Sequence, residues 1–324
     1  MNKLRLLILG LLATLLTGCS LEDERDDCGV TFKFRYVLNS EDRFKKDVTS
    51  MRHFLFDGND IYMGEYVDIC GYTNELKIRG LKKGNYTLVT ICNATERTRL
   101  SELTPGRSLL SEFTQGISSQ QQNGCYTNGD QLFYNACPFS ISETDPDTWI
   151  CDLSNIHCHL HVLATWDYSP SFRNNDFTMR LSEVPASYSL ATDSTRRILQ
   201  QFDDPALRVS TGENHVQLFP LAPQTLAAHL VSVLPFNAEL EAEFVTERYT
   251  NQWVPILQVF NGETAVTGRL NLDRAFTYFG WWPDNNPAQE YYIRLVIHRD
   301  GSVDMDRWAR GRVNDWIDGG TITN

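Results

Sequence analysis

The chain has 324 residues, of which 42% are hydrophobic, so it can bury a core of ordinary globular size. Its 41 acidic residues outnumber 29 basic ones, giving a formal net charge of −12. This balance excludes nucleic acid as the expected partner, because phosphate backbones require a basic surface. It equally disfavours adsorption to anionic lipid headgroups.

The first eighteen residues have the layout of a signal peptide. Lys3 and Arg5 precede an apolar run at 6–16, which is shorter than the roughly 20 residues needed to cross a membrane as a helix. The stretch "LTGC" (16–19) resembles the lipobox of bacterial lipoproteins. That resemblance implies cleavage between Gly18 and Cys19, with acyl chains such as palmitate added at Cys19. The alternative is an ordinary buried cysteine.

A dense acidic stretch follows at once. Five of the six residues at 22–27 are acidic, so we expect 19–28 to be a solvated tether. The stretch also resembles the acidic export signal of surface lipoproteins in Bacteroidetes, which would place the protein on the outer face of the outer membrane. A polar linker without targeting information is the alternative.

The first series of predicted elements has a period of two. Residues 30–36 alternate apolar and polar side chains, as a half-buried strand does. Residues 51–67 predict a hairpin with its turn at 57–60, and 75–93 repeat strand, turn and strand with the turn at 82–85. Residues 95–125 predict a loop with a short helix near 109–113.

A second series of strands begins near Trp149. In the run 156–162, His157, His159 and His161 alternate with apolar side chains. Further strands are predicted at 178–191, 214–220, 228–235, 239–247 and 254–260, and two last strands are predicted to start at 290 and 302. The best helix prediction is 194–204, with Ser194 as its N-cap. The pattern predicts an all-β protein of two antiparallel β-sandwich domains, at 29–148 and 149–324.

Four stretches in this order resemble the FimB-like minor fimbrial subunits of Bacteroidales, which are anchor lipoproteins of type V pili. They are "CGVTFKFRYVLN" (28–39), "VTSMRHFLFDGNDIY" (48–62), "LKKGNYTLVTICNATE" (81–96) and "RGRVNDWI" (310–317). The positions that match the family pattern are Val30, Phe32, Phe34, Tyr36, Phe56, Asp57, Gly84, Tyr86, Leu88, Asn93, Val313, Asn314 and Trp316.

The resemblance implies two tandem transthyretin-like domains and assembly by strand complementation. The chain would accept a donor strand from a stalk pilin and so anchor or terminate the pilus; base anchor and tip subunit remain alternatives. An anchor would keep its lipid, so Arg25 in the tether is expected to stay uncut. Seven cysteines lie beyond Cys19, more than the family usually has, and cross-strand disulfides are expected from them.

No enzyme or cofactor is expected, because nucleophile-elbow, metalloprotease, Walker and dinucleotide motifs do not occur in the sequence. The three histidines are read as an exposed polar strand face, and Asp300, Asp304 and Asp306 as part of a hairpin, so no metal is expected. The rival function is glycan binding by an aromatic loop at 278–282, with Trp281 and Trp282 stacking on sugars. Ser194 could also be an O-glycosylation site.

Overall fold

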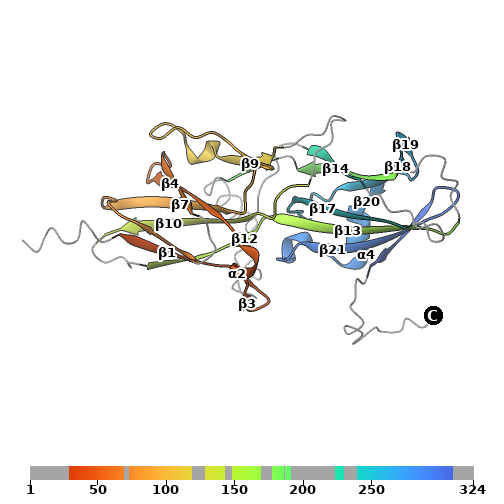
Figure 1. Cartoon of the computed structure of the whole chain (residues 1–324), viewed down its shortest axis with the longest axis horizontal. Helices are drawn as coiled ribbons and strands as arrows, with labels where there is room; N and C mark the ends of the chain where they lie inside the picture. The colour runs from red at the N-terminus through yellow and green to blue at the C-terminus, as the bar shows by residue number, and fades with distance from the viewer. Residues whose placement is uncertain are drawn as a thin grey trace, which may run out of the picture.

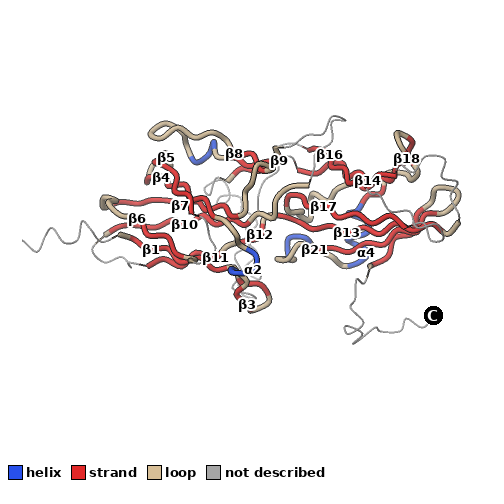
Figure 2. The backbone as a smooth tube through the Cα atoms, in the orientation of Figure 1, coloured by secondary structure: helices blue, strands red, loops and turns tan. Residues whose placement is uncertain are grey.

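The computed structural model describes residues 29–68, 73–118, 128–142, 148–168, 177–185, 187–190, 223–229 and 239–308. This part of the chain is mostly strand, in two groups of sheets placed end to end (Figures 1 and 2), which confirms the all-β prediction. The signal peptide, the tether, the helix predicted at 194–204 with Ser194, and the strand predicted at 214–220 lie outside the described residues.

The first group is a sandwich of two sheets. Sheet I has the order β11 (Thr148–Asp152), β1 (Val30–Arg35) and β6 (Glu75–Ile78). Sheet II has the order β12 (Ser154–Asn155), β10 (Phe133–Ile141), β7 (Gly84–Cys92), β4 (Met51–Asp57) and β5 (Tyr62–Asp68). The predicted alternation in β1 is confirmed, because Phe32 and Phe34 are fully buried between the sheets. Only β1 and β11 pair in parallel here.

The outer face of sheet II is itself partly covered. A small sheet of β15 (Ser187–Ser189), β9 (Thr114–Ile117) and β8 (Thr98–Leu100), with the 3-10 turn η1 (Leu110–Glu112), packs there around Phe54, Phe113 and Tyr188. The short helix expected near 109–113 is therefore present as η1. The strands β8 and β9 were not predicted.

Two predicted turns differ in outcome. The 57–60 turn is confirmed: Asp57 Oδ1 accepts the backbone N–H groups of Asn59 and Ile61, both at 2.9 Å, and β4 pairs with β5. At 82–85 the strand–turn–strand prediction is wrong as a hairpin, because β6 pairs with β1 while β7 pairs with β4 and β10. The sequence of β7 explains this: it is apolar on both faces, as a central strand must be.

The second group is also a sandwich. Sheet III has the order β17 (Glu239–Glu247), β13 (His157–Trp166), β21 (Glu290–Ile297) and β22 (Val303–Arg307). Sheet IV has the order β16 (Pro223–His229), β14 (Phe177–Pro185), β18 (Ile256–Asn261) and β19 (Thr264–Ala265), with β20 (Leu270–Asn271) also on β18. β13 and β21 are parallel. The shortest elements are β2 (Val37–Leu38), β3 (Glu41–Asp42), α2 (Phe44–Asp47) and η2 (Pro283–Asn285).

Two α-helices were not predicted, the four-residue α2 and the longer α4. α4 (Leu272–Phe279) begins at Asn271, whose side chain accepts the Asp273 N–H at 2.9 Å, and ends at Gly280 with φ 67°. Its buried residues recur at helical spacing and pack against the second core, at Leu272, Ala275, Phe276 and Phe279. These signals were present in the sequence, but "YFGWWP" was read as an aromatic loop.

The two groups of sheets are tied together at their junction. β11 and β12 still pair with β1 and β10, so the chain leaves the first sandwich only after residue 155. The predicted division at 148/149 stays a prediction. Contacts cross the junction: Gln115 Nε2 donates to Glu247 Oε2 at 2.7 Å, and the Tyr188 hydroxyl donates to the Arg248 carbonyl at 2.7 Å.

Candidate functional site

The predicted lipidation residues cannot be placed. Gly18, Cys19 and Arg25 lie outside the described residues, as do Val313, Asn314 and Trp316 of the C-terminal motif. Within the described ranges, no helix has both the length and the apolar character needed to cross a membrane. Lipid attachment at Cys19 therefore stays a prediction from the sequence.

The motif residues that can be placed are structural. Leu88 is fully buried in the first core, and the Tyr86 hydroxyl donates to the Lys82 carbonyl at 2.8 Å. Asn93 has φ 63° and joins three segments through its side chain amide. These residues of the fimbrial-subunit pattern thus stabilise the first sandwich, and none of them is a reactive group.

Cys137, Cys151 and Cys158 are free thiols in the structure. Cys137 and Cys151 are buried thiols in the first core, and Cys158 lies in the second core, where burial raises the pKa of its thiol. At these three positions the expectation of cross-strand disulfides is therefore wrong, and Cys28, Cys70 and Cys125 lie outside the described residues. These side chains act as small apolar residues of the two cores.

The aromatic loop divides into two kinds of residue. Trp281 packs on Phe276 and Tyr291, with ring centroids 5.2 and 5.4 Å apart, so it belongs to the second core. Tyr278 is 83% exposed and Trp282 is 51% exposed. Of the two tryptophans predicted to stack on sugars, only Trp282 has a large exposed area.

The three histidines of β13 share one face of sheet III, as predicted, but that face is not simply exposed. His157 and His161 are buried and His159 is half-buried. The ring of His161 stacks on Tyr292, with centroids 4.4 Å apart, and His157 packs on Phe133 of the first sandwich at 5.3 Å. Neighbouring strands and the adjoining sandwich thus cover most of the histidine face, which the alternation of the sequence predicted to be exposed to solvent.

Carboxylates flank this histidine row on both sides. His159 Nδ1 lies 2.9 Å from Glu243 Oε1 on β17, and His161 Nε2 lies 3.7 Å from Glu290 Oε1 on β21. Contact with the His161 imidazole, aided by a hydrogen bond from the Tyr292 hydroxyl, lowers the pKa of Glu290 to about 2. Burial lowers the pKa of His157 to about 3, so that ring is neutral.

The outer edge of β11 is an open strand edge of the first sandwich in the part of the chain that the structure describes. No described strand pairs with β11 on the side away from β1. Ile150 on this strand is 51% exposed, and the half-buried Trp149 has an indole N–H that is buried without a hydrogen-bond partner.

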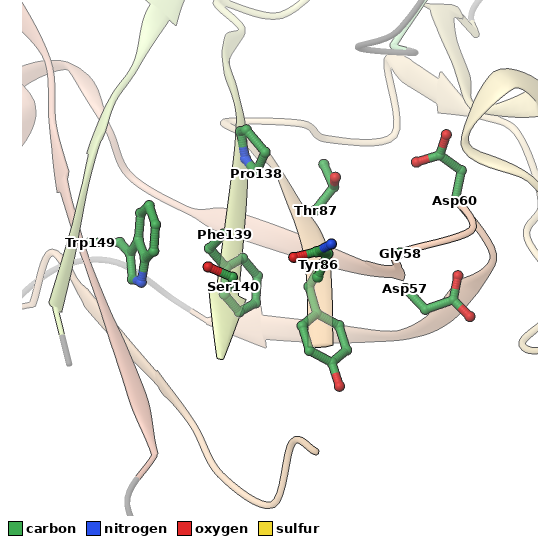
Figure 3. A pocket seen from close by; sticks show the side chains of 10 residues that line it. Asp57, Gly58, Asp60, Tyr86, Thr87, Pro138, Phe139, Ser140 and Trp149 are labelled. Atoms are coloured by element: carbon green, nitrogen blue, oxygen red, sulfur yellow. The ribbon is translucent and has the colours of Figure 1, made fainter. Parts of the chain in front are cut away.

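A pocket of about 290 Å³ adjoins this edge. In Figure 3, Trp149 of β11 lies on one side and Asp57 and Asp60 of the β4–β5 turn lie on the other, with residues of β7 and β10 between them. Phe139 contacts both Trp149 and Tyr86, with ring centroids 6.2 and 5.4 Å apart. Sequence reasoning missed this site, because it gathers residues from four separate segments.

Comparison with known structures supports the fold. A candidate adhesin from Bacteroides ovatus aligns with a TM-score of 0.66 and 14% identity, covering 87% of this chain and 95% of that one. A candidate polysaccharide-binding protein from Bacteroides thetaiotaomicron gives 0.64 and 13%, covering 88% and 99%. The fimbrial anchor protein Mfa2 from Porphyromonas gingivalis gives 0.62 and 15%, covering 86% and 97%.

The sequence comparisons give the family. No curated protein sequence matches the chain. Residues 23–221, more than half of the chain, match the family described as fimbrillin-A associated anchor proteins Mfa1 and Mfa2. The resemblance to fimbrial anchor subunits is thereby confirmed, and the chain belongs to the family of fimbrillin-A associated anchor proteins.

Proposed function

We propose that the protein is a surface lipoprotein that anchors or terminates a type V pilus by accepting a donor strand from a stalk pilin along β11. The family supports a fimbrial and adhesive role in general. The observation that carries the finer proposal is the open, apolar edge of β11. An unpaired edge offers a row of backbone N–H and C=O groups to an incoming strand.

Four other outer strands of the described sheets, β5, β6, β17 and β22, are better protected against pairing. β6, β17 and β22 carry exposed charges such as Glu75, Glu241 and Asp304. β5 is irregular near Gly64, and its first residue, Tyr62, already exchanges backbone hydrogen bonds with 106–108. Charges and irregularities are the usual devices that prevent edge pairing. β11 instead exposes the apolar side chain of Ile150, which would not repel an incoming strand.

The pocket beside β11 suits one side chain of a donor strand. Its wall contains Trp149 and Phe139, and its volume of about 290 Å³ would hold a large apolar residue. Strand addition takes affinity from the backbone ladder and specificity from such pockets. The Trp149 indole N–H, which lacks a partner in the described structure, would find an acceptor on the added strand.

Lipid on Cys19 would supply the attachment to the outer membrane. Several acyl chains anchor a protein stably, because each buried methylene group contributes about 0.8 kcal/mol. The test for the anchor is Cys19→Ala: we expect the protein to leave the membrane fraction while its circular dichroism spectrum stays unchanged.

We also propose that the two sandwiches are separate domains with the division near 148–156.

The test of strand acceptance is a detergent pull-down of the tagged protein from cells that assemble the pilus. The variant Ile150→Lys places a charge on the β11 edge, and recovery of the stalk pilin should fall about tenfold, the effect of roughly 1.4 kcal/mol. The matched control is Met63→Lys on β5, where the side chain is 43% exposed. Equal recovery with both variants would contradict acceptance at β11.

Glycan binding is the second candidate. Tyr278 and Trp282 are large exposed aromatic side chains near one end of α4, and exposed rings of this kind stack on sugar faces. Trp282→Ala should then abolish saturable binding to a glycan array, whereas Trp253→Ala should not. The absence of any saturable glycan binding by the unmodified protein would remove this candidate.

A further inference from the structure

We propose that sheet III carries a transition-metal site, in which His159, His161 and Glu243 bind Zn²⁺ with Glu290 as the fourth ligand. This inference goes beyond the fimbrial role and is independent of how the pilin is held. It contradicts the expectation that the histidine row is only a polar face. The argument comes from the placement of four side chains on three neighbouring strands.

The strand geometry holds the ligands in place. β13 is paired on both sides, and its other face, including Leu160, is fully buried in the second core. Successive side chains of a strand point to opposite faces, so His159 and His161 must both point away from that core. The registers set His161 opposite Glu243 on β17 and His159 opposite Glu290 on β21. The two carboxylates thus flank the two imidazoles.

The distances fit a single ion. One donor atom from each of His159, His161 and Glu243 lies within 4.8 Å of the other two. His159 Nδ1 and Glu243 Oε1 are 2.9 Å apart, and Glu290 Oε1 lies 3.7 Å from His161 Nε2. In a tetrahedral site with metal bonds of 2.0–2.2 Å, neighbouring donor atoms lie about 3.3 Å apart. Small changes in side-chain torsions would bring the donor atoms of His159, His161 and Glu243 to that spacing, and Glu290 approaches the group from the side of His161.

The donor set selects the class of metal. Imidazole nitrogen suits zinc, copper and nickel, whereas calcium and magnesium require oxygen ligands in larger number. Two imidazoles and two carboxylates would give a neutral Zn²⁺ complex. The site lies on a sheet surface that is half-buried at His159, with both carboxylate side chains 49% exposed. An ion can therefore reach it from solvent.

Neighbouring groups orient the ligands. The Tyr292 ring stacks on His161 with an interplanar angle of 5°, and its hydroxyl donates to Glu290. Asn128 Nδ2 donates to the Glu243 carbonyl at 2.9 Å, which fixes β17 at this point. Such hydrogen bonds around a metal site restrict the ligand rotamers. His157 is not part of this group: its ring is buried and packs edge-on against Phe133 of the first sandwich, with centroids 5.3 Å apart.

The test is isothermal titration of the full-length protein in detergent with zinc chloride, and separately with calcium chloride. We expect one Zn²⁺ per chain and no saturable Ca²⁺ binding. His159→Gln and Glu243→Gln should each weaken Zn²⁺ binding at least about tenfold, because losing even a hydrogen-bond partner of a metal ligand costs about 10–100-fold in affinity. Co²⁺ in place of Zn²⁺ should give the intense visible absorption of a tetrahedral complex, and His161→Gln should abolish it.

The control is His298→Gln. His298 also lies between carboxylates, with Asp167 at 2.6 Å and Asp304 at 3.0 Å, but at the other end of β21. This variant should keep the Zn²⁺ affinity of the unmodified protein. Equal affinity in His159→Gln, Glu243→Gln and the unmodified protein would overturn the proposal, as would a lack of Zn²⁺ binding. Each variant is checked for folding by its thermal transition.

Discussion

At the scale of single residues, Glu247 is a carboxyl group buried where the two sandwiches meet. Its exposed fraction is 3%, and its carboxylate accepts a hydrogen bond from the Gln115 amide. Burial raises the pKa of Glu247 from 4.5 to about 8, with a further contribution from Asp130. A carboxyl in such surroundings binds a proton in the folded state at pH values where the unfolded chain has released it.

The sign of the pH dependence follows. The folded pKa lies above the unfolded one, so the stability linked to Glu247 is fully present below pH 4.5 and is lost as the pH rises through 8. Glu247→Gln removes this titration and should flatten the decline over that range. Urea midpoints at several pH values measure it, with the exposed Glu239→Gln as control. A decline that is equally steep in Glu247→Gln would contradict the assignment.

Asn93 is the second residue whose role can be tested. Its side chain accepts the Thr49 N–H at 2.8 Å and donates to the Asp47 and Gln131 carbonyls at 2.7 and 3.1 Å. Its backbone is left-handed, which disfavours most side chains. Asn93→Ala should lower the free energy of unfolding by about 2–3 kcal/mol, from lost hydrogen bonds and backbone strain.

Asn93→Gly separates the two causes. Glycine accepts the left-handed backbone, so the variant reports the lost side-chain hydrogen bonds. Chemical denaturation of both variants gives the two free energies. If Asn93→Ala unfolds at the same denaturant concentration as the unmodified protein, the side chain does not hold these segments together.

At the scale of elements, local patterns predicted the strands whose two faces differ. β1, β13, β17 and β21 alternate strongly because one face meets a core, and they lie where the period of two put them. β8 and β9 are short and pair with each other, and β9 also gains hydrogen bonds from β15, which lies far along the chain. A pairing between distant segments leaves no local pattern, so neither strand could be read from the sequence.

The same limit applies to the candidate sites. A lipobox could be predicted at 16–19 because export machinery reads such a signal from a continuous stretch of chain. The β11 pocket and the carboxylates beside His159 and His161 come from separate strands, and only the register brings them together. The alternation placed the histidines on one face, but it could not identify Glu243 and Glu290 as their neighbours.

α4 gives a prediction at the same scale. Gly280 ends the helix with φ 67°, and a Cβ atom there would meet no atom within 4 Å. Gly280→Ala should therefore destabilise the protein by about 1 kcal/mol through the backbone conformation alone. Gly268→Ala is the matched control, because that position has equal space but no positive φ. Equal thermal midpoints for the two variants would contradict this account of the helix end.

At the scale of the whole molecule, the chain crosses between its two sandwiches more than once. β15 follows β14 of the second sandwich in the sequence, yet it pairs with β9 over the first one. Ile117 at the end of β9 packs into the second core. Neither sandwich is thus completed by a continuous stretch of chain, and unfolding of one should remove packing from the other.

Tyr188 of β15 is the residue through which this coupling can be tested. It is 1% exposed, packs with Phe113, and donates its hydroxyl hydrogen to the Arg248 carbonyl at 2.7 Å. The unmodified protein should unfold in a single calorimetric transition. Tyr188→Ala should lower stability by about 3–5 kcal/mol, as large buried aromatic deletions do, and should split the transition in two.

The control for this prediction is Tyr278→Ala, because Tyr278 is 83% exposed and its removal should leave one transition at the original temperature. Two transitions in the unmodified protein would show that the sandwiches unfold independently and that the β15 crossing does not couple them. A single, lowered transition in Tyr188→Ala would mean that other junction contacts, such as the hydrogen bond from Gln115 to Glu247, suffice for cooperativity. The combined variant Tyr188→Ala, Gln115→Ala should then separate the two transitions, since it removes the hydrogen bonds that these two side chains donate to Arg248 and Glu247 across the junction.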